Sequence, residues 1–324
     1  MNDDKGLVFG VLFNGNGGGK ELSWEGLTSW TPEKGTLWIH LNYENPQAQK
    51  WLSEDSGLPS IIIQALTEEE TRPRNVPVEN GLMLILRGVN MNPGADPEDM
   101  VSLRLWIEKD RIISMRHRKV MAIADIRGEF SQGDGPSNTG EFLVELIDRL
   151  LSRMGTVLMD IEEEVASFED EVLSAENYEL RVRIGETRRK AIRIRRYLLP
   201  QREVTVNLQH EKVSWLEESQ RLHLRELADR ITRYVEDLDS SKDRAALAKD
   251  ELEARLAEQT NKTMYVLSIV AAIFLPLGLL TGLLGINVGG IPGTENEWAF
   301  TIVCVLLVFI AIFLGWRFKK MKWI

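Results

Sequence analysis

Residues 264–284 read MYVLSIVAAIFLPLGLLTGLL, and residues 299–316 read AFTIVCVLLVFIAIFLGW. Neither stretch contains a charged residue, although 27% of the whole chain is charged. A helix rises about 1.5 Å per residue, so each stretch is long enough to cross the roughly 30 Å core of a bilayer. Two such stretches so close together favour two transmembrane helices over two buried helices of a soluble protein.

The charges that flank these stretches predict how the chain is oriented. The connection at 285–298 carries two acids, Glu295 and Glu297, and no lysine or arginine. Lys262 precedes the first stretch, and the tail at 317–324 is basic. The positive-inside rule then places both termini in the cytoplasm and the connection outside. Two helices cannot enclose an ion path, so one copy would be an anchor, and a pore requires several copies around an axis.

The residues before the first span predict an α/β domain at 1–135. Short β-rich runs are expected as strands at 7–13, 36–43 and 82–90. The runs at 101–108 and 111–117 are expected to form a hairpin, and a helix is expected at 53–71. The stretch at 131–140 is rich in Gly, Ser, Asn and Pro, which indicates a domain boundary.

Helical arms are predicted at 136–200 from charge and periodicity. An acidic outer face follows residue 141, and a strongly basic run occupies 178–199. This pattern indicates an antiparallel helix pair matched by charge rather than a phosphate or nucleic-acid site. Pro200 is expected to end the second arm. No Gly or Pro occurs from 201 to 275, so one long stalk helix is expected over 201–284, with the first span at 264–284.

A row of apolar and small residues follows steps of three and four along this stalk, and we expect it to continue into the first span. The cytoplasmic part, called the seam, has coiled-coil-like spacing and consists of Leu224, Leu227, Ile231, Tyr234, Leu238, Ser241, Ala245, Ala248 and Leu252. The membrane part, called the span stripe, consists of Met264, Leu267, Ala271, Leu275, Gly278 and Gly282. The span stripe is either a pore lining or a small-residue packing face of the Gly-xxx-Gly type.

Composition disfavours several other functions. The net charge is −10, with 49 acidic against 39 basic residues, which argues against a nucleic-acid partner. The acidic surface either keeps a soluble domain in solution or concentrates cations. Cys304 is the only cysteine, so no disulfide can form within the chain. No metal-hydrolase, phosphate-loop or nucleophile motif is present, so we expect no enzymatic activity.

The end of the first span resembles a known family. The sequence FLP at 274–276, followed by TGLLGIN at 281–287, resembles the CorA superfamily of metal-ion transporters. Ile286 replaces the methionine of that family's Gly-Met-Asn motif. The following VGGIPG at 288–293 is similar to the zinc-transporter branch, ZntB. The predicted architecture of the whole chain, an α/β domain, arms, stalk and two C-terminal spans, is similar to the same family.

The resemblance implies a homopentameric funnel in the bacterial inner membrane, surrounded by lipid, with the first span lining the pore. It implies that Gly285, Ile286 and Asn287 form the ion entry and selectivity site. The transported ion would be Zn2+, with Mg2+, Co2+, Ni2+ and Cd2+ as alternatives. Zinc uptake is expected, with or without coupling to protons. A magnesium or cobalt channel and zinc efflux are alternatives within the superfamily, and a membrane-anchored sensor or enzyme lies outside it.

The chemistry of these residues fits a hydrated divalent cation. Asn287 offers an amide oxygen and two N–H donors, and copies of it with the Gly285 carbonyls could hold the water shell of a cation. Bare zinc prefers His, Cys or carboxylate ligands. The alternative role of Asn287 is to cap a helix end. A ring of Glu295 and Glu297 would attract cations. Among the four histidines, which are more simply interpreted as surface or packed residues, His223 beside the seam is the candidate metal ligand.

Overall fold

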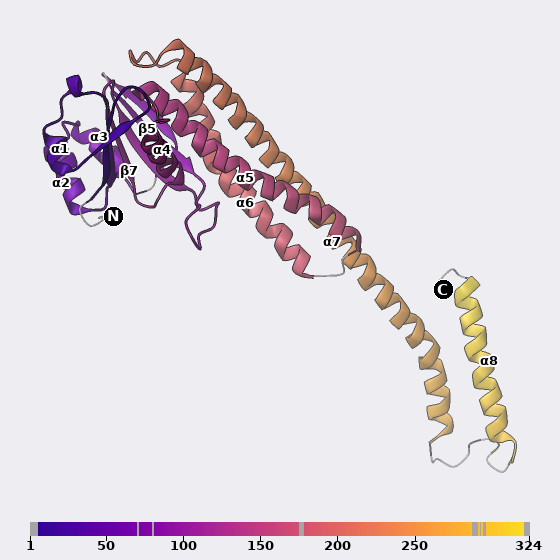
Figure 1. The fold of residues 1–324 in the computed structure, drawn as a ribbon. Helices are drawn as coiled ribbons and strands as arrows, with labels where there is room; N and C mark the ends of the chain where they lie inside the picture. The colour runs from indigo at the N-terminus through magenta and orange to yellow at the C-terminus, as the bar shows by residue number, and fades with distance from the viewer. Residues whose placement is uncertain are drawn as a thin grey trace. The chain divides into compact units, whose positions relative to one another are not determined.

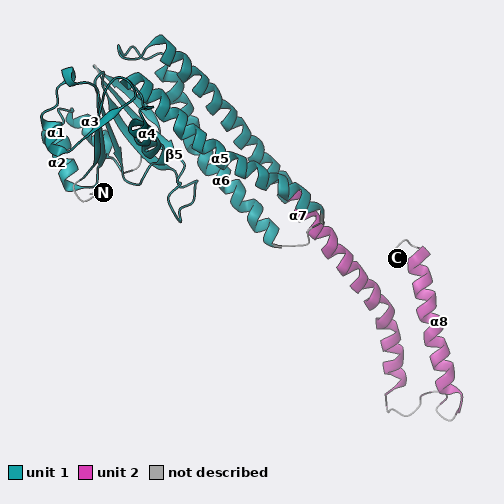
Figure 2. Ribbon diagram, viewed as in Figure 1, with its two compact units in different colours: residues 1–249 teal, residues 250–324 magenta. Residues whose placement is uncertain are grey.

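The structure is a computed structural model that describes residues 6–69, 71–79, 81–174, 178–286, 291, 293 and 296–320. The chain divides into two compact units, residues 1–249 and residues 250–324 (Figure 2). The first unit contains a sheet domain with helices, and the second contains long apolar helical segments. The predicted α/β domain, long helix and two C-terminal apolar helices are therefore confirmed.

The elements occur in the following order along the chain (Figure 1): β1 (Leu7–Phe13), β2 (Gly19–Leu22), α1 (Trp24–Thr28), the 3-10 helix η2 (Pro32–Lys34), β3 (Leu37–Asn42), α2 (Pro46–Glu54), α3 (Ser60–Thr67), β4 (Arg74–Val78), β5 (Gly81–Gly88), β6 (Val101–Ile107), β7 (Arg111–Arg116), α4 (Met121–Gln132), α5 (Thr139–Ser174), α6 (Tyr178–Leu208), α7 (Glu218–Leu284) and α8 (Ala299–Lys320).

One seven-stranded sheet forms the centre of the first unit, in the order β2-β1-β3-β7-β6-β5-β4. Strands β3 and β7 are parallel, and the other strand pairs in the described residues are antiparallel. The predicted hairpin of β6 and β7 is confirmed, and the Glu108 N–H donates to the Arg111 carbonyl across its turn (2.8 Å). The sequence patterns do not predict β4, which contains Pro77. An edge strand tolerates proline because its outer side needs no donor.

Helices cover both faces of the sheet, as β3 shows. Successive side chains of a strand point to opposite faces. Leu37, Ile39 and Leu41 belong to a core with α2 and α3, whereas Trp38 packs against Phe142 of α5 with ring centroids 4.8 Å apart. All five side chains are buried. The continuous apolar run of this strand follows from coverage on both sides.

His40 is a buried polar group within this apolar strand. It is 1% exposed, and its Nδ1 lies 2.8 Å from the Ser114 hydroxyl, which also accepts a hydrogen bond from Trp38. The His40 Nε2 is buried without a hydrogen-bond partner among the described residues. Burial lowers the pKa of His40 well below its usual value, and the charges of Arg116 and Arg127 lower this pKa further. The imidazole is therefore neutral in the folded chain at neutral pH.

His40 is expected to make the stability of the fold depend on pH. Because its pKa is lower in the folded chain, the unfolded chain binds the proton first as the pH falls below about 6.5. Above that pH, His40 is neutral in both states and does not lower the free energy of unfolding. Below it, the proton bound by the unfolded chain lowers the free energy of unfolding, until the pH reaches the pKa of His40 in the folded chain. We expect the unfolding temperature of the full-length protein in detergent to fall between about pH 7.5 and 5.5, and His40→Gln to reduce that slope. His210→Gln changes an exposed histidine and serves as the control. Equal slopes in His40→Gln and wild type would contradict the prediction.

Ion pairs between oppositely charged helices organise the rest of the first unit. The predicted antiparallel pair of α5 and α6 is confirmed, because Arg183 lies 2.7 Å from Glu171 and Lys190 lies 3.7 Å from Glu164. Two further ion pairs join α5 to α7, Asp148–Arg230 and Glu169–Arg244, each at 2.6 Å. The acidic face of α5 is therefore shared by both neighbouring helices.

The seam residues of α7 that belong to the first unit, from Leu224 to Ala248, are buried or half-buried. Leu224, Ile231 and Ala245 are fully buried. Gly155 of α5 allows a close approach to α7, since a Cβ at that position would lie 2.5 Å from the Tyr234 hydroxyl. The seam thus packs α7 against a neighbouring helix of the same chain, as coiled-coil-like spacing predicts.

The predicted end of the second arm at Pro200 is wrong. Helix α6 continues through Pro200 to Leu208. Proline removes one N–H donor from the helix. The turns around it nevertheless bury Leu198, Gln201 and Val204, so tertiary packing outweighs the lost hydrogen bond.

The predicted start of the stalk helix at residue 201 is also wrong. Helix α7 begins at Glu218, after a connection that follows α6. The Gln220 side chain accepts a hydrogen bond from the Glu217 N–H (2.9 Å), which is half of a capping box. The prediction failed because a run without Gly or Pro does not show where a helix begins, whereas this capping interaction fixes the start of α7.

The helix predicted at 53–71 is confirmed only in part, because α2 ends at Glu54 and α3 occupies Ser60–Thr67. Gly57 between them has φ +70°, a left-handed conformation that glycine adopts readily. Pro59 then lies at the N-cap of α3, where its fixed φ is compatible with the turn. The sequence patterns also do not predict β2 or α4.

Candidate functional site

The second unit carries two helices with the length and composition of membrane spans. The apolar window of α7 has a mean hydropathy of 2.4 and that of α8 has 2.8, and none of either window is buried in the single chain. An exposed apolar surface of this size is unfavourable in water and suits the hydrocarbon core of a bilayer. The protein is therefore anchored by two transmembrane helices.

The span stripe is an exposed row on α7. Met264 is 59%, Leu267 68% and Leu275 71% exposed. A Cβ added at Gly278 or Gly282 would meet no atom within 4 Å, so both glycines leave the helix surface open to close approach. Ala271 is likewise exposed. In the described residues of one chain, nothing covers this row.

A second row on α7 is half-buried. It consists of Ile269, Ile273, Pro276 and Leu280. At about 100° per residue, this row lies on nearly the opposite side of the helix from the span stripe. The two faces of the first span therefore differ in exposure within one chain.

The span stripe does not continue the seam, so the expectation of one continuous face is wrong. Leu252 ends the seam fully buried, whereas Met264 is largely exposed. Alternating steps of three and four from Leu252 miss Met264, and at about 100° per residue the two positions are about 120° apart around α7.

The candidate selectivity motif begins where α7 ends. The helix ends at Leu284, and the Gly285 N–H donates to the carbonyls of Thr281 (2.9 Å) and Gly282 (3.2 Å). Ile286 is 49% exposed. The third residue of the motif, Asn287, lies outside the described residues.

Glu297, one of the two acids of the connection between the spans, lies just before the start of α8. The Asn296 side chain accepts a hydrogen bond from the Trp298 N–H (2.9 Å), which satisfies one of the free donors there. Glu297 is exposed beside this helix start. The second predicted acid, Glu295, lies outside the described residues.

Polar groups within the first span are satisfied by their own helix. The Thr281 hydroxyl donates to the carbonyls of Leu277 (3.0 Å) or Gly278 (3.1 Å), and the Ser268 hydroxyl donates to the Met264 carbonyl (2.8 Å). The sequence from 264 to 286 contains no Asp, Glu, His, Lys or Arg. The first span therefore offers apolar side chains, hydroxyl oxygens and backbone carbonyls, and no ionisable side chain.

His223 is an exposed residue of α7 beside a surface hollow that also contains Asp134, Glu141 and Glu145. Within the described part of the chain, no group of three or more His, Cys, Asp or Glu residues is arranged to hold a metal ion. The structure therefore does not join His223 to a second and third ligand.

One group of charged residues is missed by reasoning from the sequence. The basic run of α6 supplies ion pairs, as predicted, but Arg193 and Arg196 line a cavity together with Arg87, Arg104 and Arg118. The available signal is an arginine inside each of two apolar strands, Arg87 in β5 and Arg104 in β6. Their convergence with α6 depends on the tertiary fold.

Comparison with known proteins identifies the class of protein. Residues 33–320 match the family described as CorA-like Mg2+ transporter protein. The chain belongs to this family of divalent-cation transporters, as its two spans and the motif at 285–287 predict.

Individual relatives cover almost the whole chain. The divalent cation transporter CmaX of Pseudomonas aeruginosa is 37% identical over 99% of this chain and 98% of its own length. The zinc transport protein ZntB of Yersinia enterocolitica is 34% identical over 98% of this chain and 96% of its own length. Among solved structures, the full-length CmaX protein has a TM-score of 0.86 at 36% identity and covers 98% of both chains. The CorA magnesium transporter from Methanocaldococcus jannaschii has a TM-score of 0.83 at 19% identity, over 98% of this chain and 99% of that chain, which shows the fold alone.

Proposed function

We propose that this chain imports Zn2+ across the bacterial inner membrane through a homopentameric pore. The observation that carries the proposal is its similarity over 98% of its length to a zinc transport protein. The family description names Mg2+ instead. We give more weight to the relative because it is 34% identical to this chain.

In this proposal several copies of α7 surround the ion path. The uncovered span stripe supports this arrangement, because one chain leaves it exposed while the opposite face of the helix is half-buried. Both termini lie in the cytoplasm, with the domain at 1–135, the arms at 136–200 and the stalk below the membrane. The spans at 264–284 and 299–316 are joined outside by 285–298, and the tail at 317–324 is cytoplasmic.

The ion enters at the outer end of the first span in this proposal. Gly285 ends the helix, so its carbonyl has no intrahelical partner. Ile286 and Asn287 follow directly, and the amide oxygen of Asn287 can accept hydrogen bonds from the water shell of a cation. The ion is therefore recognised with its water attached, which does not require the His or Cys ligands of a bare zinc site.

Flux through purified full-length protein in liposomes tests the proposal. Zn2+, Mg2+, Co2+, Ni2+ and Cd2+ are supplied outside in turn, with and without a proton gradient. We expect Zn2+ to enter faster than Mg2+, and a proton gradient to change the rate if transport is coupled. Faster Mg2+ or Co2+ entry would favour the magnesium or cobalt channel. Exclusively outward zinc flux would favour efflux, and an absence of flux would favour an anchored sensor.

The acids of the outer connection are expected to concentrate cations near the pore. Exposed charges act over distances limited by a Debye length of about 8 Å at physiological salt. Replacing both Glu295 and Glu297 with Gln should therefore reduce uptake more at low salt than at high salt. Glu25→Gln with Glu33→Gln, which removes two exposed acids of the α/β domain, is the control. An equal reduction at both salt concentrations would indicate direct ligation instead.

A further inference from the structure

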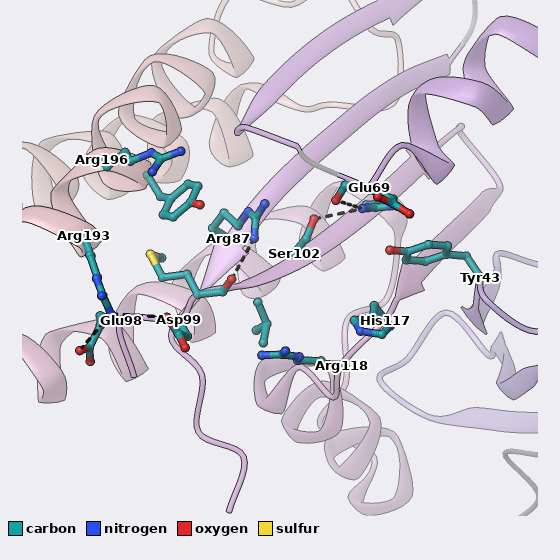
Figure 3. A pocket seen from close by; sticks show the side chains of 14 residues that line it. Tyr43, Glu69, Arg87, Glu98, Asp99, Ser102, His117, Arg118, Arg193 and Arg196 are labelled. Atoms are coloured by element: carbon teal, nitrogen blue, oxygen red, sulfur yellow. Dashed lines mark hydrogen bonds and ion pairs between the residues drawn. The ribbon is translucent and has the colours of Figure 1, made fainter. Parts of the chain in front are cut away.

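A cavity of about 430 Å3 lies in the first unit beside strands β5 and β6 and helix α6 (Figure 3). Side chains of five arginines and three acids line it, together with Tyr43, Tyr197 and others. The arginines are Arg87, Arg104, Arg118, Arg193 and Arg196, and the acids are Glu69, Glu98 and Asp99. The balance of charge in the wall is therefore positive, in a chain whose overall charge is negative.

Two of these arginines have no carboxylate partner among the described residues. Arg104 is 1% exposed, and its guanidinium donates to the backbone carbonyls of Leu66 (2.9 Å) and Glu69 (3.3 Å). Arg87 donates to the carbonyls of Met100 (2.9 Å) and Thr71 (2.5 Å). Carbonyl dipoles satisfy these N–H groups, but they do not neutralise a buried charge.

The Arg87 Nε is also buried without a hydrogen-bond partner in the described part of the chain. Desolvation by burial lowers the pKa of both Arg87 and Arg104, and their mutual repulsion lowers that of Arg87 further. The folded chain therefore carries two partly desolvated cations beside a cavity. An anion in that cavity would supply the charge that both lack.

Aromatic rings hold the inner arginines in place. The Arg104 guanidinium lies 4.2 Å from the ring centre of Tyr43, and that of Arg87 lies 4.7 Å from the ring centre of Tyr197. Arg196 also lies over Tyr197, at 5.5 Å. Stacking fixes the plane of a guanidinium, so less freedom is lost when it binds a ligand.

The outer arginines are available at the edge of the cavity. Arg118 and Arg196 are exposed, and neither forms an ion pair among the described residues. Arg193 lies 3.8 Å from Glu98 and 3.7 Å from Asp99, which are long distances for ion pairs. Figure 3 shows Arg193 and Arg118 on different sides of the space, with Arg87 between the strands and α6.

We propose that this cavity binds a small molecule that carries phosphate groups. Planar guanidinium forks match the paired oxygens of phosphate, and several of them around one space favour a ligand with more than one negative charge. The volume falls within the roughly 300–1,000 Å3 typical of small-molecule sites and exceeds what a single halide ion needs. The site lies between the sheet and helix α6 and involves no residue of the ion path, so it is independent of the function proposed above.

Calorimetric titration of the detergent-solubilised full-length protein tests this proposal. The probes are inorganic phosphate, pyrophosphate and ATP, in buffer freed of divalent cations so that chelation does not contribute heat. Ionic strength is held constant with sodium chloride. We expect saturable binding of pyrophosphate or ATP, tighter than that of phosphate, that persists in the presence of chloride.

Arg118→Gln combined with Arg196→Gln is the informative variant because both residues are exposed and the change leaves the buried arginines in place. It should weaken binding at least about tenfold, since each residue would donate charge-assisted hydrogen bonds. Arg225→Gln, an exposed arginine of α7 outside the cavity, is the control and should bind as wild type. No saturable binding of any probe, unchanged affinity in the double variant, or displacement by chloride alone would overturn the proposal.

Discussion

Replacing Asn287 with alanine is expected to abolish selective divalent-cation uptake while leaving assembly of the protein intact. Asn287 follows Gly285 and Ile286, directly after an uncharged membrane span. In the proposed pore every copy contributes one amide at the outer mouth. Alanine removes the oxygen that would accept a hydrogen bond from water bound to the cation.

The expected loss is large because the removed contact recurs in every copy. A hydrogen bond contributes about 0.5–1.5 kcal/mol, so the loss of one in each of several copies corresponds to roughly tenfold or more in affinity. We expect Zn2+ uptake in liposomes to fall at least about tenfold, or the preference for Zn2+ over Mg2+ to disappear.

A second asparagine of the same connection provides the matched control. Asn296 accepts a hydrogen bond from the Trp298 N–H just before α8, so Asn296→Ala should lower stability by about 1 kcal/mol without changing which cation passes. Size-exclusion chromatography and crosslinking establish that both variants assemble as wild type does. If Asn287→Ala retained wild-type uptake and selectivity, the role of this amide would be only that of a helix cap.

Leu267→Asn or Leu275→Asn is expected to give a leaky pore that selects poorly among cations. Both leucines lie on the span stripe and are about 70% exposed in one chain. Rings of such apolar side chains would form a constriction that loses its water and blocks a hydrated ion. An asparagine side chain hydrogen-bonds water and keeps the constriction wet, so ions pass without the helices moving apart.

The same substitution on the other face should act differently. Val266 and Ile273 lie away from the span stripe, and Ile273 belongs to the half-buried row. An amide placed there without a partner costs about 1–3 kcal/mol. Val266→Asn and Ile273→Asn should therefore lower the yield or the unfolding temperature, with little rise in leak.

Cysteine scanning decides whether the span stripe faces the ion path. Single cysteines are placed along 264–285 in a Cys304→Ser background and labelled with a water-soluble thiol reagent. Labelling should recur every three to four residues and centre on Met264, Leu267 and Leu275. Labelling centred on Ile269 and Ile273 would show that the span stripe is a packing face, and the proposed apolar gate would then be wrong.

The seam and the span stripe lie on different faces of α7. Tyr234 of the seam lies close to Gly155 of α5 within one chain, whereas the span stripe lies on a different side of α7. A continuous face cannot serve both neighbours, because one is a helix of the same chain and the other is the ion path in the proposed pore. The same helix therefore requires two faces, and the shift lies between Leu252 and Met264.

The sequence by itself determined the membrane part of this protein. The spans can be predicted from two uncharged runs, from the absence of Gly and Pro before the first of them and from the basic tail. Crossing a bilayer constrains amino-acid composition directly. The hairpin of β6 and β7 and the charge-matched pair of α5 and α6 were equally predictable, because short-range spacing defines them. The family resemblance rests on the same stretch, near the end of the first span.

The tertiary structure alone decided the features that depend on distant residues. Pro200 does not end α6, because side chains on both sides of it are buried against the rest of the unit. His40 looks like an ordinary strand residue in the sequence, yet the fold buries it without a partner for Nε2. The arginines of the cavity come from β5, β6, the segment after β7 and α6, and only the order of strands in the sheet brings them together. Local periodicity does not encode such convergence, because it reports which face of an element is apolar and not which other element covers that face.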